Sequence, residues 1–456
     1  MTNHNDSTVD DDVIDPLAPA IADASTDCAV EEPVRLDRIF WRYTVAVTML
    51  GAAIRVVILI SKWNEQPKLN DSIYYAIQAQ QNADGHWFKE PLNYLAQGAE
   101  HAPLTSLVLT PAGIIHDAFP WMRLTMTVIG ILVVPLIAVL GRSIAGRRVG
   151  IVAALFAAVY PNIWMTDSLV MSETLCNLGM VLALLAAVRH RAKFTCQSAL
   201  WLGAACGFAA LARAEVLLAA PLFALIGIRA RPKPIWLTRV AMIGVATFLV
   251  ISPWVLYNLG RFDAPVLMST NEGSTLLGAN CPATYSGPSL GGWELECLGA
   301  PRPSLEEDTS ERNSRRRQEA IDYANGHRSR IPIVVGARVG RMLDLYGWSS
   351  QIRGDVGEER YRWAIIAGML SWGVLAPAAA IGWWRSRRTS AVLLVVPAIC
   401  VAAVAVVFYG GHRLRSPIET ALVVAAAIGY CGSPRVQRLI DRVLDRTGDE
   451  TLARRR

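Results

Sequence analysis

Hydrophobic residues along the chain are grouped in long blocks rather than in amphipathic stripes. A helix needs roughly 17–25 apolar residues to cross the hydrocarbon core of a bilayer. We predict ten membrane-spanning helices, at residues 40–60, 121–140, 149–164, 170–188, 199–211, 216–228, 237–257, 363–383, 391–409 and 418–430. The pattern therefore predicts an all-α polytopic membrane protein, with two large loops at residues 61–120 and 258–362.

One further segment, residues 103–116, is apolar but short, and it is interrupted by Pro103 and Pro111. We expect it to lie in the outer interface of the membrane or to re-enter the membrane from that side. A complete additional span is the alternative.

Clusters of arginine and lysine between the apolar blocks predict the orientation of the helices, because such clusters remain on the cytoplasmic side. With ten spans, all of these clusters fall on one side, and an eleventh span would break that agreement. We therefore expect an inner (plasma) membrane protein with both termini in the cytoplasm and both large loops outside. The clusters are Arg35/Arg38/Arg42, Arg142/Arg147/Arg148, Arg189/Arg191/Lys193, Arg229/Arg231/Lys233, Arg385/Arg387/Arg388 and the tail 435–456.

The composition agrees with a membrane protein and excludes a nucleic-acid-binding one. Of the 456 residues, 53% are hydrophobic and only 18% are charged, whereas about a quarter are charged in soluble domains. The net charge of +6 arises mainly from the clusters that orient the spans. Residues 1–38 are expected to form a disordered acidic cytoplasmic tail and residues 433–456 a basic one, flanking a transmembrane domain at 39–432.

The second loop contains two of the eight cysteines, Cys281 and Cys297. A loop facing an oxidising compartment favours a disulfide between them, and two free thiols are the alternative. The spacing of the cysteines and histidines does not match a structural zinc site.

Asp71 lies shortly after the first span, before a segment, 72–82, that is compatible with a helix. Asn70 or Asp71 is expected to cap this helix. Asp71 has two interpretations: it caps the helix, or it is a carboxylate at the membrane surface that accepts a proton from a hydroxyl acceptor.

Ionisable residues recur at five outer turns, and such residues at membrane depth are candidates for function. Each one taken alone is also compatible with an interfacial or snorkelling side chain. Arg213, Arg413 and Arg415 are suited to bind a phosphate, because a guanidinium holds phosphate oxygens in a bidentate manner. The remaining candidates for an acceptor, a sugar or a divalent cation are His101, Asp167, Glu173, Glu215, His412 and Glu419.

The order of several short motifs resembles the C-type (GT-C fold) integral membrane glycosyltransferases that use polyprenyl-phosphate sugars. This group includes the dolichyl-phosphate-mannose–protein mannosyltransferases and the bacterial aminoarabinose transferases. The similarity extends from about residue 40 to residue 430. Its motifs are the first acidic motif at Asp71 with Tyr74-Tyr75, His101-Ala102-Pro103-Leu104, the turn 146–161 followed by Asp167 and Glu173, Leu211–Glu215, Ser252–Asn258, Ser269–Asn280 and Arg413–Glu419.

The resemblance implies an inverting glycosyl transfer on the outer face of the membrane. Asp71 would be the general base, a hydroxyl of a glycan, lipid or protein the acceptor, and arginines such as Arg213 and Arg415 would hold the polyprenyl phosphate that leaves. Two positions depart from the family pattern. Ser72 stands where most relatives have a second acidic residue, and Ala214 replaces the usual proline.

Two other classes of function are compatible with a polytopic membrane protein: a lipid or polysaccharide transporter or flippase, and an inactive scaffold. A transporter predicts ionisable residues in the middle of spans and paired repeats, whereas here they lie at the outer ends. Within the enzymes, a ligase or polymerase of surface polysaccharide is the nearest competitor. The sequence does not identify the sugar or the acceptor.

Overall fold

The chain divides into two units, Met1–Arg42 and Tyr43–Arg456, and every candidate residue lies in the second. A computed structural model describes residues 38–68, 70–91, 93–299 and 308–432. The tails predicted at 1–38 and 433–456 fall, except for Arg38, outside the described residues.

In the described part of the chain, seven helical segments are long and apolar enough to cross a membrane, which confirms the predicted class of all-α polytopic protein. They are α1 (Arg38–Lys62), α4 (Ala118–Ala145), α7 (Glu173–Lys193), α10 (Lys233–Leu259), α16 (Arg362–Ser386), η6 with α17 (Ser390–Val395, Val396–Val407) and η7 with α18 (His412–Arg415, Ser416–Cys431).

The other three predicted spans fall on shorter helices. They correspond to α5 (Arg147–Val159) with α6 (Pro161–Trp164), to α8 (Cys196–Ala212), and to η2 (Ala214–Leu218) with α9 (Ala219–Ala224). Thirteen residues in α5 and 17 in α8 give lengths below the roughly 30 Å of a bilayer core, at about 1.5 Å per residue. The predicted number of ten spans therefore remains a prediction.

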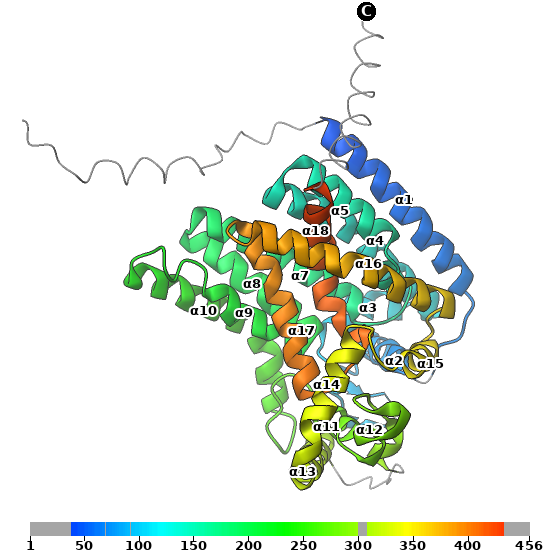
Figure 1. Ribbon diagram of the computed structural model, residues 1–456. Helices are drawn as coiled ribbons and strands as arrows, with labels where there is room; N and C mark the ends of the chain where they lie inside the picture. Colours follow the sequence, from blue (N-terminus) through cyan, green and yellow to red (C-terminus); the bar gives the residue numbers. More distant parts are fainter. Residues whose placement is uncertain (1–37, 69, 92, 300–307, 433–456) are drawn as a thin grey trace, which may run out of the picture. The chain divides into compact units, whose positions relative to one another are not determined.

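Helix α18 lies at the centre of the long helices and packs against α16, α5 and α7 (Figure 1). Most side chains of η7 and α18 are buried, whereas most of those of α10 are exposed or only partly buried. A small residue allows the backbones of α18 and α16 to approach closely at Gly429. A Cβ at this position would lie only 2.1 Å from the carbonyl oxygen of Ala378 on α16, so no larger residue fits. In contrast, α10 exposes large apolar side chains such as Phe248 and Leu249, as expected for a helix facing lipid.

The first large loop is folded. It contains α2 (Asp71–Ala83), a two-stranded antiparallel hairpin of β1 (Lys89–Glu90) and β2 (Asn93–Gln97), and α3 (Leu104–Gly113). Helix α3 covers the apolar segment predicted at 103–116. Its 10 residues span about 15 Å, which is half of a bilayer core. Its length is therefore compatible with the interfacial or re-entrant interpretation and not with a complete span.

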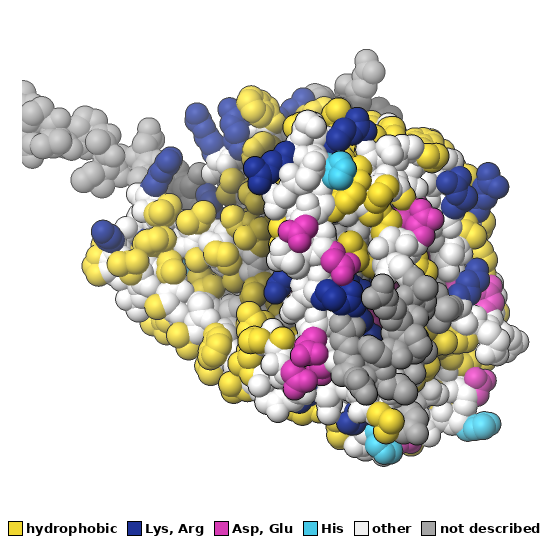
Figure 2. Space-filling model, turned by 90° about the horizontal axis from the view of Figure 1, so that it is seen from below, with side chains coloured by type: hydrophobic (Ala, Val, Ile, Leu, Met, Phe, Trp, Pro, Cys, Tyr) yellow, Lys and Arg dark blue, Asp and Glu magenta, His cyan; other side chains and the backbone are white. Residues whose placement is uncertain are grey.

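The second large loop is mainly helical. Its elements are α11 (Glu272–Ala279), α12 (Pro282–Tyr285), η3 (Gly287–Ser289), η4 (Leu295–Leu298), α13 (Thr309–Gly326), η5 (Arg328–Arg330), α14 (Ile331–Met342) and α15 (Trp348–Gly357). A disulfide joins Cys281 and Cys297, whose Cα atoms are 6.0 Å apart. Figure 2 views the protein from the side of these loops: charged side chains of both signs gather over one part of the face and hydrophobic side chains over another.

Candidate functional site

Asp71 is the first residue of α2, and its carboxylate is not used to cap that helix. Asn70 is the N-cap, and its side-chain oxygen accepts a hydrogen bond of 2.8 Å from the backbone N–H of Ser72. The side chain of Asp71 is 29% exposed. The capping interpretation of Asp71 therefore does not hold, since Asn70 fills that role.

The side chain of Arg413 connects three carboxylates that are far apart in the sequence. Its Nε donates to Glu173 at 2.7 Å, and its two Nη atoms form close ion pairs with Glu358 and Asp71. These partners come from α2, from the start of α7 and from the segment that precedes α16. The guanidinium therefore stands at the junction of four elements.

Two more arginines complete this cluster. Arg213, between α8 and η2, donates to Glu215 at 2.6 Å and to Glu173 at 3.3 Å. Arg360 lies 3.6 Å from Glu173 and 3.1 Å from Asp355. Glu173 is fully buried, and a buried carboxylate of this kind is stable only when it is paired with cations. We call the set Asp71, Glu173, Arg213, Glu358, Arg360 and Arg413 the charge cluster.

The charge cluster keeps Asp71 ionised. Burial raises the pKa of Asp71, but the nearby guanidinium of Arg413 and the imidazole of His101 outweigh that effect and hold the pKa well below its usual range. Burial also raises the pKa of Glu358, and there the arginines offset only part of the effect. Of the three carboxylates that Arg413 contacts, Asp71 and Glu358 are thus not equivalent, because only Asp71 has a lowered pKa of these two.

His101 contacts the other oxygen of Asp71. Its Nε2 lies 3.6 Å from Asp71 Oδ1, is buried, and has no hydrogen-bond partner. The ring centroid of His101 lies 5.0 Å from that of Tyr74 and 4.8 Å from that of Tyr75, both on α2. The motif Asp71…Tyr74-Tyr75 and the motif at His101 are therefore parts of one site.

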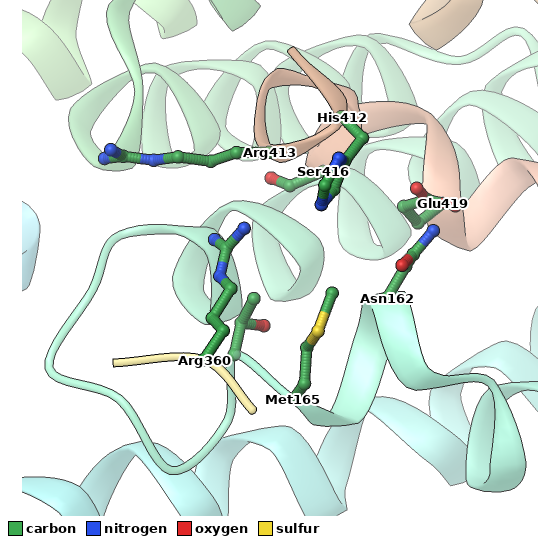
Figure 3. A pocket seen from close by; sticks show the side chains of 8 residues that line it. Asn162, Met165, Arg360, His412, Arg413, Ser416 and Glu419 are labelled. Atoms are coloured by element: carbon green, nitrogen blue, oxygen red, sulfur yellow. The ribbon is translucent and has the colours of Figure 1, made fainter. Parts of the chain in front are cut away.

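A small pocket adjoins the charge cluster (Figure 3). In this view Arg360 and Met165 approach from one side and His412 and Ser416 from the other, while the side chain of Arg413 extends away from them. The residues that line the pocket are Asn162, Met165, Thr166, Arg360, His412, Arg413, Ser416 and Glu419. The pocket thus joins η7 and the start of α18 to the turn after α6.

Arg415 belongs to a deeper network than Arg413. Its Nη1 donates to Asp344 at 2.7 Å, its Nε lies 3.3 Å from Glu419, and its guanidinium covers the ring of Trp372 at 3.9 Å. The side chain of Arg415 is fully buried. His412 lies beside this network, close to Asp355 and 3.7 Å from Asp344. These residues hold η7 in place from within.

Asp167 is placed apart from the charge cluster. It accepts a hydrogen bond of 2.7 Å from Arg55 on α1 and one of 2.8 Å from Thr174, and both charged side chains are buried. In the described part of the chain, no ion pair connects Asp167 with Asp71 or with the arginines of the cluster. Its direct contacts are those of a residue that fixes the turn before α7.

Four charged residues of the site and of the network behind it were not predicted from the sequence: Asp344, Asp355, Glu358 and Arg360. Three of these lie in the segment 355–360, which precedes α16 directly. A signal was present, since a dense run of charges directly before a candidate span is unusual in a mainly apolar chain. Among the described residues, no group of three or more His, Cys, Asp or Glu side chains is arranged to hold a metal ion.

The sequence matches one family model over a limited part of its length. Residues 100–257 match the model of dolichyl-phosphate-mannose-protein mannosyltransferase, which confirms the resemblance found in the motifs. A search of curated proteins finds no match.

Solved structures with a similar fold include the archaeal oligosaccharyltransferase AglB from Archaeoglobus fulgidus, in complex with an inhibitory peptide and a dolichol-phosphate. That likeness has a TM-score of 0.54 at 15% identity and covers 88% of this chain and 52% of the other. The apo form of the Archaeoglobus fulgidus oligosaccharyltransferase gives a TM-score of 0.51 at 13% identity over 88% and 52%.

This chain thus spans about half the length of the archaeal oligosaccharyltransferase and shares its GT-C fold over the matched part, as predicted. ArnT from Cupriavidus metallidurans, bound to undecaprenyl phosphate, is matched with a TM-score of 0.43 at 14% identity over 84% and 77%. That score is too low to support an argument.

Proposed function

We propose that this protein is a membrane glycosyltransferase that moves a sugar from a polyprenyl-phosphate donor to a hydroxyl acceptor. The observation that carries the proposal is the charge cluster. It combines an ionised, partly exposed carboxylate, Asp71, with guanidiniums that can hold a phosphate, Arg213 and Arg413. A base for the acceptor and a cation for the leaving group are the two groups that this reaction requires.

The charge cluster is proposed to face the outside of the cell. It lies at the start of α7 and just before α16, whereas the basic residues Arg189/Arg191/Lys193 and Arg385/Arg387/Arg388 lie at or just beyond the opposite ends of these helices. The 21 residues of α7 separate its two ends by about 30 Å. Because basic clusters remain in the cytoplasm, the opposite ends are outside.

In the proposed reaction, Asp71 accepts the proton of the acceptor hydroxyl as the hydroxyl oxygen attacks the anomeric carbon of the donor sugar. The bond between that carbon and the phosphate oxygen breaks, and its electron pair remains on the polyprenyl phosphate. Arg213 and Arg413 stabilise the negative charge that develops there. A single displacement of this kind inverts the anomeric configuration.

The site residues have different roles in this proposal. Arg415, which the sequence grouped with the phosphate-binding arginines, is buried and forms ion pairs with Asp344 and Glu419, and we assign it a positioning role for η7. His412 and Glu419 support the same segment, and Asp167 supports the turn before α7. His101, Glu173 and Glu215 hold the side chains of Asp71, Arg413 and Arg213.

The comparisons support this proposal at the level of fold and family. The matched family model describes an enzyme that transfers mannose from a dolichyl phosphate, and the similar archaeal structure was solved with a dolichol-phosphate. The sugar and the nature of the acceptor, whether glycan, lipid or protein, are not specified by the site.

The test is glycosyl transfer by purified protein from a panel of polyprenyl-phosphate sugars, with Asp71→Asn compared with wild type. We expect a loss of about a hundredfold or more in kcat, because a positioned general base contributes about 10²–10⁴ in rate. Asp322→Asn on the exposed face of α13 is the matched control. Turnover of every donor by Asp71→Asn at the wild-type rate contradicts the proposed base. Absence of transfer by wild type, together with movement of labelled lipid across vesicles, supports a flippase instead.

A further inference from the structure

Helix α14 has its polarity reversed relative to a surface helix of a soluble protein. Its two interior arginines, Arg338 and Arg341, point inward and are 4% and 5% exposed. Its exposed positions, by contrast, carry apolar residues or glycine: Pro332, Ile333, Gly336 and Val339. In water a helix presents the opposite arrangement, with charges outside and apolar residues within.

The buried arginines of α14 are matched by polar groups of neighbouring segments. Arg338 donates to the carbonyl oxygen of Ala279 at 2.8 Å and to that of Val406 at 3.1 Å. Arg341 donates to Ser350 at 2.8 Å and to the carbonyl oxygen of Gly410 at 3.3 Å. Arg338 therefore ties α14 to α11 and α17, and Arg341 ties it to α15 and to the turn before η7. Neither guanidinium is available to interact with solvent or with anionic lipid.

The turn after α14 continues the apolar surface. Leu345 is 77% exposed, and Leu343, Tyr346 and Trp348 are also exposed. The indole N–H of Trp348 donates to the backbone carbonyl of Asp344, so the ring is held in place by the turn itself. We call Ile333, Val339, Leu343, Leu345, Tyr346 and Trp348 the α14 surface.

We propose that the α14 surface is embedded in the outer leaflet of the bilayer, so that part of the second large loop is a membrane-seated element. Three observations favour lipid as the occupant. The charges of the helix are turned inward, which is required in hydrocarbon and unfavourable in water. Tyr346 and Trp348 are of the kind that occupies the membrane interface. The surface also adjoins Val406 and Val407, which are exposed at the end of α17, a candidate span that packs against α14 (Figure 1).

Hydrogen bonds connect the residues around the α14 surface to η7, the segment that carries Arg413 of the charge cluster. Arg415 Nη1 donates to the carbonyl oxygen of Met342 at 2.9 Å and to Asp344 at 2.7 Å, and the backbone N–H of His412 donates to Gln351 on α15 at 3.1 Å. The residues around the α14 surface therefore hold η7, and η7 carries Arg413. Lipid contact at α14 thus sets the height of the proposed phosphate-binding arginine relative to the membrane. That the leaflet is the outer one follows from the orientation proposed above.

The test measures the immersion of single positions in nanodiscs of phosphatidylcholine and phosphatidylglycerol. The full chain retains the Cys281–Cys297 disulfide and has its other six cysteines replaced by alanine. Single substitutions Val339→Cys and Leu345→Cys carry a nitroxide label. Electron paramagnetic resonance then compares the accessibility of the label to oxygen, which partitions into lipid, and to a water-soluble nickel chelate. Leu249→Cys on the exposed face of α10 is the lipid reference, and Asp322→Cys on α13 is the water reference.

We expect the labels at 339 and 345 to resemble the label at 249, with high access to oxygen and low access to nickel. High access to nickel, as at 322, overturns the proposal, because the surface then faces water. Low access to both reagents also overturns it, because protein then covers the surface. The readout does not depend on transfer, so its failure is distinct from failure of the proposed function.

A second measurement uses wild-type protein and needs no cysteine replacement. The protein in the same nanodiscs is photolabelled with a diazirine-bearing phospholipid, and the adducts are mapped by peptide mass spectrometry. We expect adducts in 331–348 and in α10. Adducts in α10 without any in 331–348 overturn the proposal.

Discussion

Asp71 and Arg413 are 342 positions apart in the sequence and form a direct ion pair. The proposed base is thus paired with an arginine proposed to bind the phosphate of the donor. A phosphate that reaches Arg413 competes with Asp71 for the same N–H groups. We therefore expect donor binding to weaken the ion pair of Arg413 with Asp71 and to leave an Asp71 oxygen available for the acceptor hydroxyl.

Arg413→Lys keeps the positive charge and removes the planar set of donors. A lysine cannot contact Asp71, Glu173 and Glu358 at the same time in the geometry of the guanidinium. We expect kcat/KM for the donor to fall by about 10²-fold, the scale observed when one preorganised donor to a developing charge is removed. Steady-state transfer kinetics measure this, with Arg328→Lys at an exposed position as the control. A loss smaller than about threefold would mean that the charge alone is sufficient.

The pH dependence of transfer reports on the same pair. In wild type the pKa of Asp71 lies well below its usual range, so Asp71 remains ionised, and able to accept a proton, well into acid. In Arg413→Gln the burial of Asp71 is no longer opposed by that guanidinium, and its pKa rises. We expect the acid limb of kcat/KM to move to higher pH.

The two profiles are compared after each is normalised to its own maximum, so that the lower activity of Arg413→Gln does not affect the comparison. Arg328→Gln serves as the control. If the acid limbs of kcat/KM for wild type and Arg413→Gln superimpose, protonation of Asp71 does not determine the loss of activity in acid.

Glu358→Gln is predicted to strengthen the binding of a polyprenyl phosphate. Glu358 competes for Arg413 and adds negative charge beside the proposed phosphate site. Its removal is expected to lower the Kd of an unreactive polyprenyl phosphate by about threefold to tenfold, or ~0.7–1.4 kcal/mol, since its side chain is partly exposed and its charge partly screened. Titration calorimetry measures the Kd, and Glu319→Gln on α13 is the control. Weaker binding would indicate that Glu358 is needed to orient Arg413.

Much of the fold could be predicted from the chain because the bilayer imposes a simple pattern. A block of apolar residues long enough to span lipid is recognisable by length alone, as in α4 and α10, and these were located to within a few residues. The short helices α5 and α8 were harder to interpret. The apolar block of α5 continues into a turn whose residues are buried by protein, and composition does not distinguish burial by protein from burial by lipid. Helix α8 is mainly apolar although it is shorter than a bilayer core.

The candidate site was predictable only in part, because some of its residues lie in recognisable motifs and others lie in a loop without one. Asp71, His101, Glu173, Arg213 and Arg413 lie in short motifs whose order is recognisable. Glu358 and Arg360 lie in a long loop whose path is determined by tertiary contacts, such as the pairing of Glu359 with Arg123 at 2.7 Å. The choice of partner also could not be read from the chain, because Asp167 and Glu173 are close in sequence yet bind different arginines.

The buried pair of Arg55 and Asp167 is predicted to matter for stability more than for chemistry. Both side chains are buried, and removal of one partner from a buried ion pair leaves the other charge uncompensated, at a cost of about 3–5 kcal/mol. We expect Asp167→Asn and Arg55→Gln each to lower the free energy of unfolding by that order. The double variant should lose less than the sum of the two, because neither charge is then left alone.

Unfolding in mixed micelles of mild detergent and sodium dodecyl sulfate measures the effect, with Asp322→Asn as the control. Asp167 also accepts a hydrogen bond from the hydroxyl of Thr174, the residue after Glu173. Some transfer activity is therefore expected to be lost as the variant unfolds. That loss should follow the fraction of folded protein. Loss of transfer by Asp167→Asn at full stability would instead assign Asp167 a direct part in the reaction.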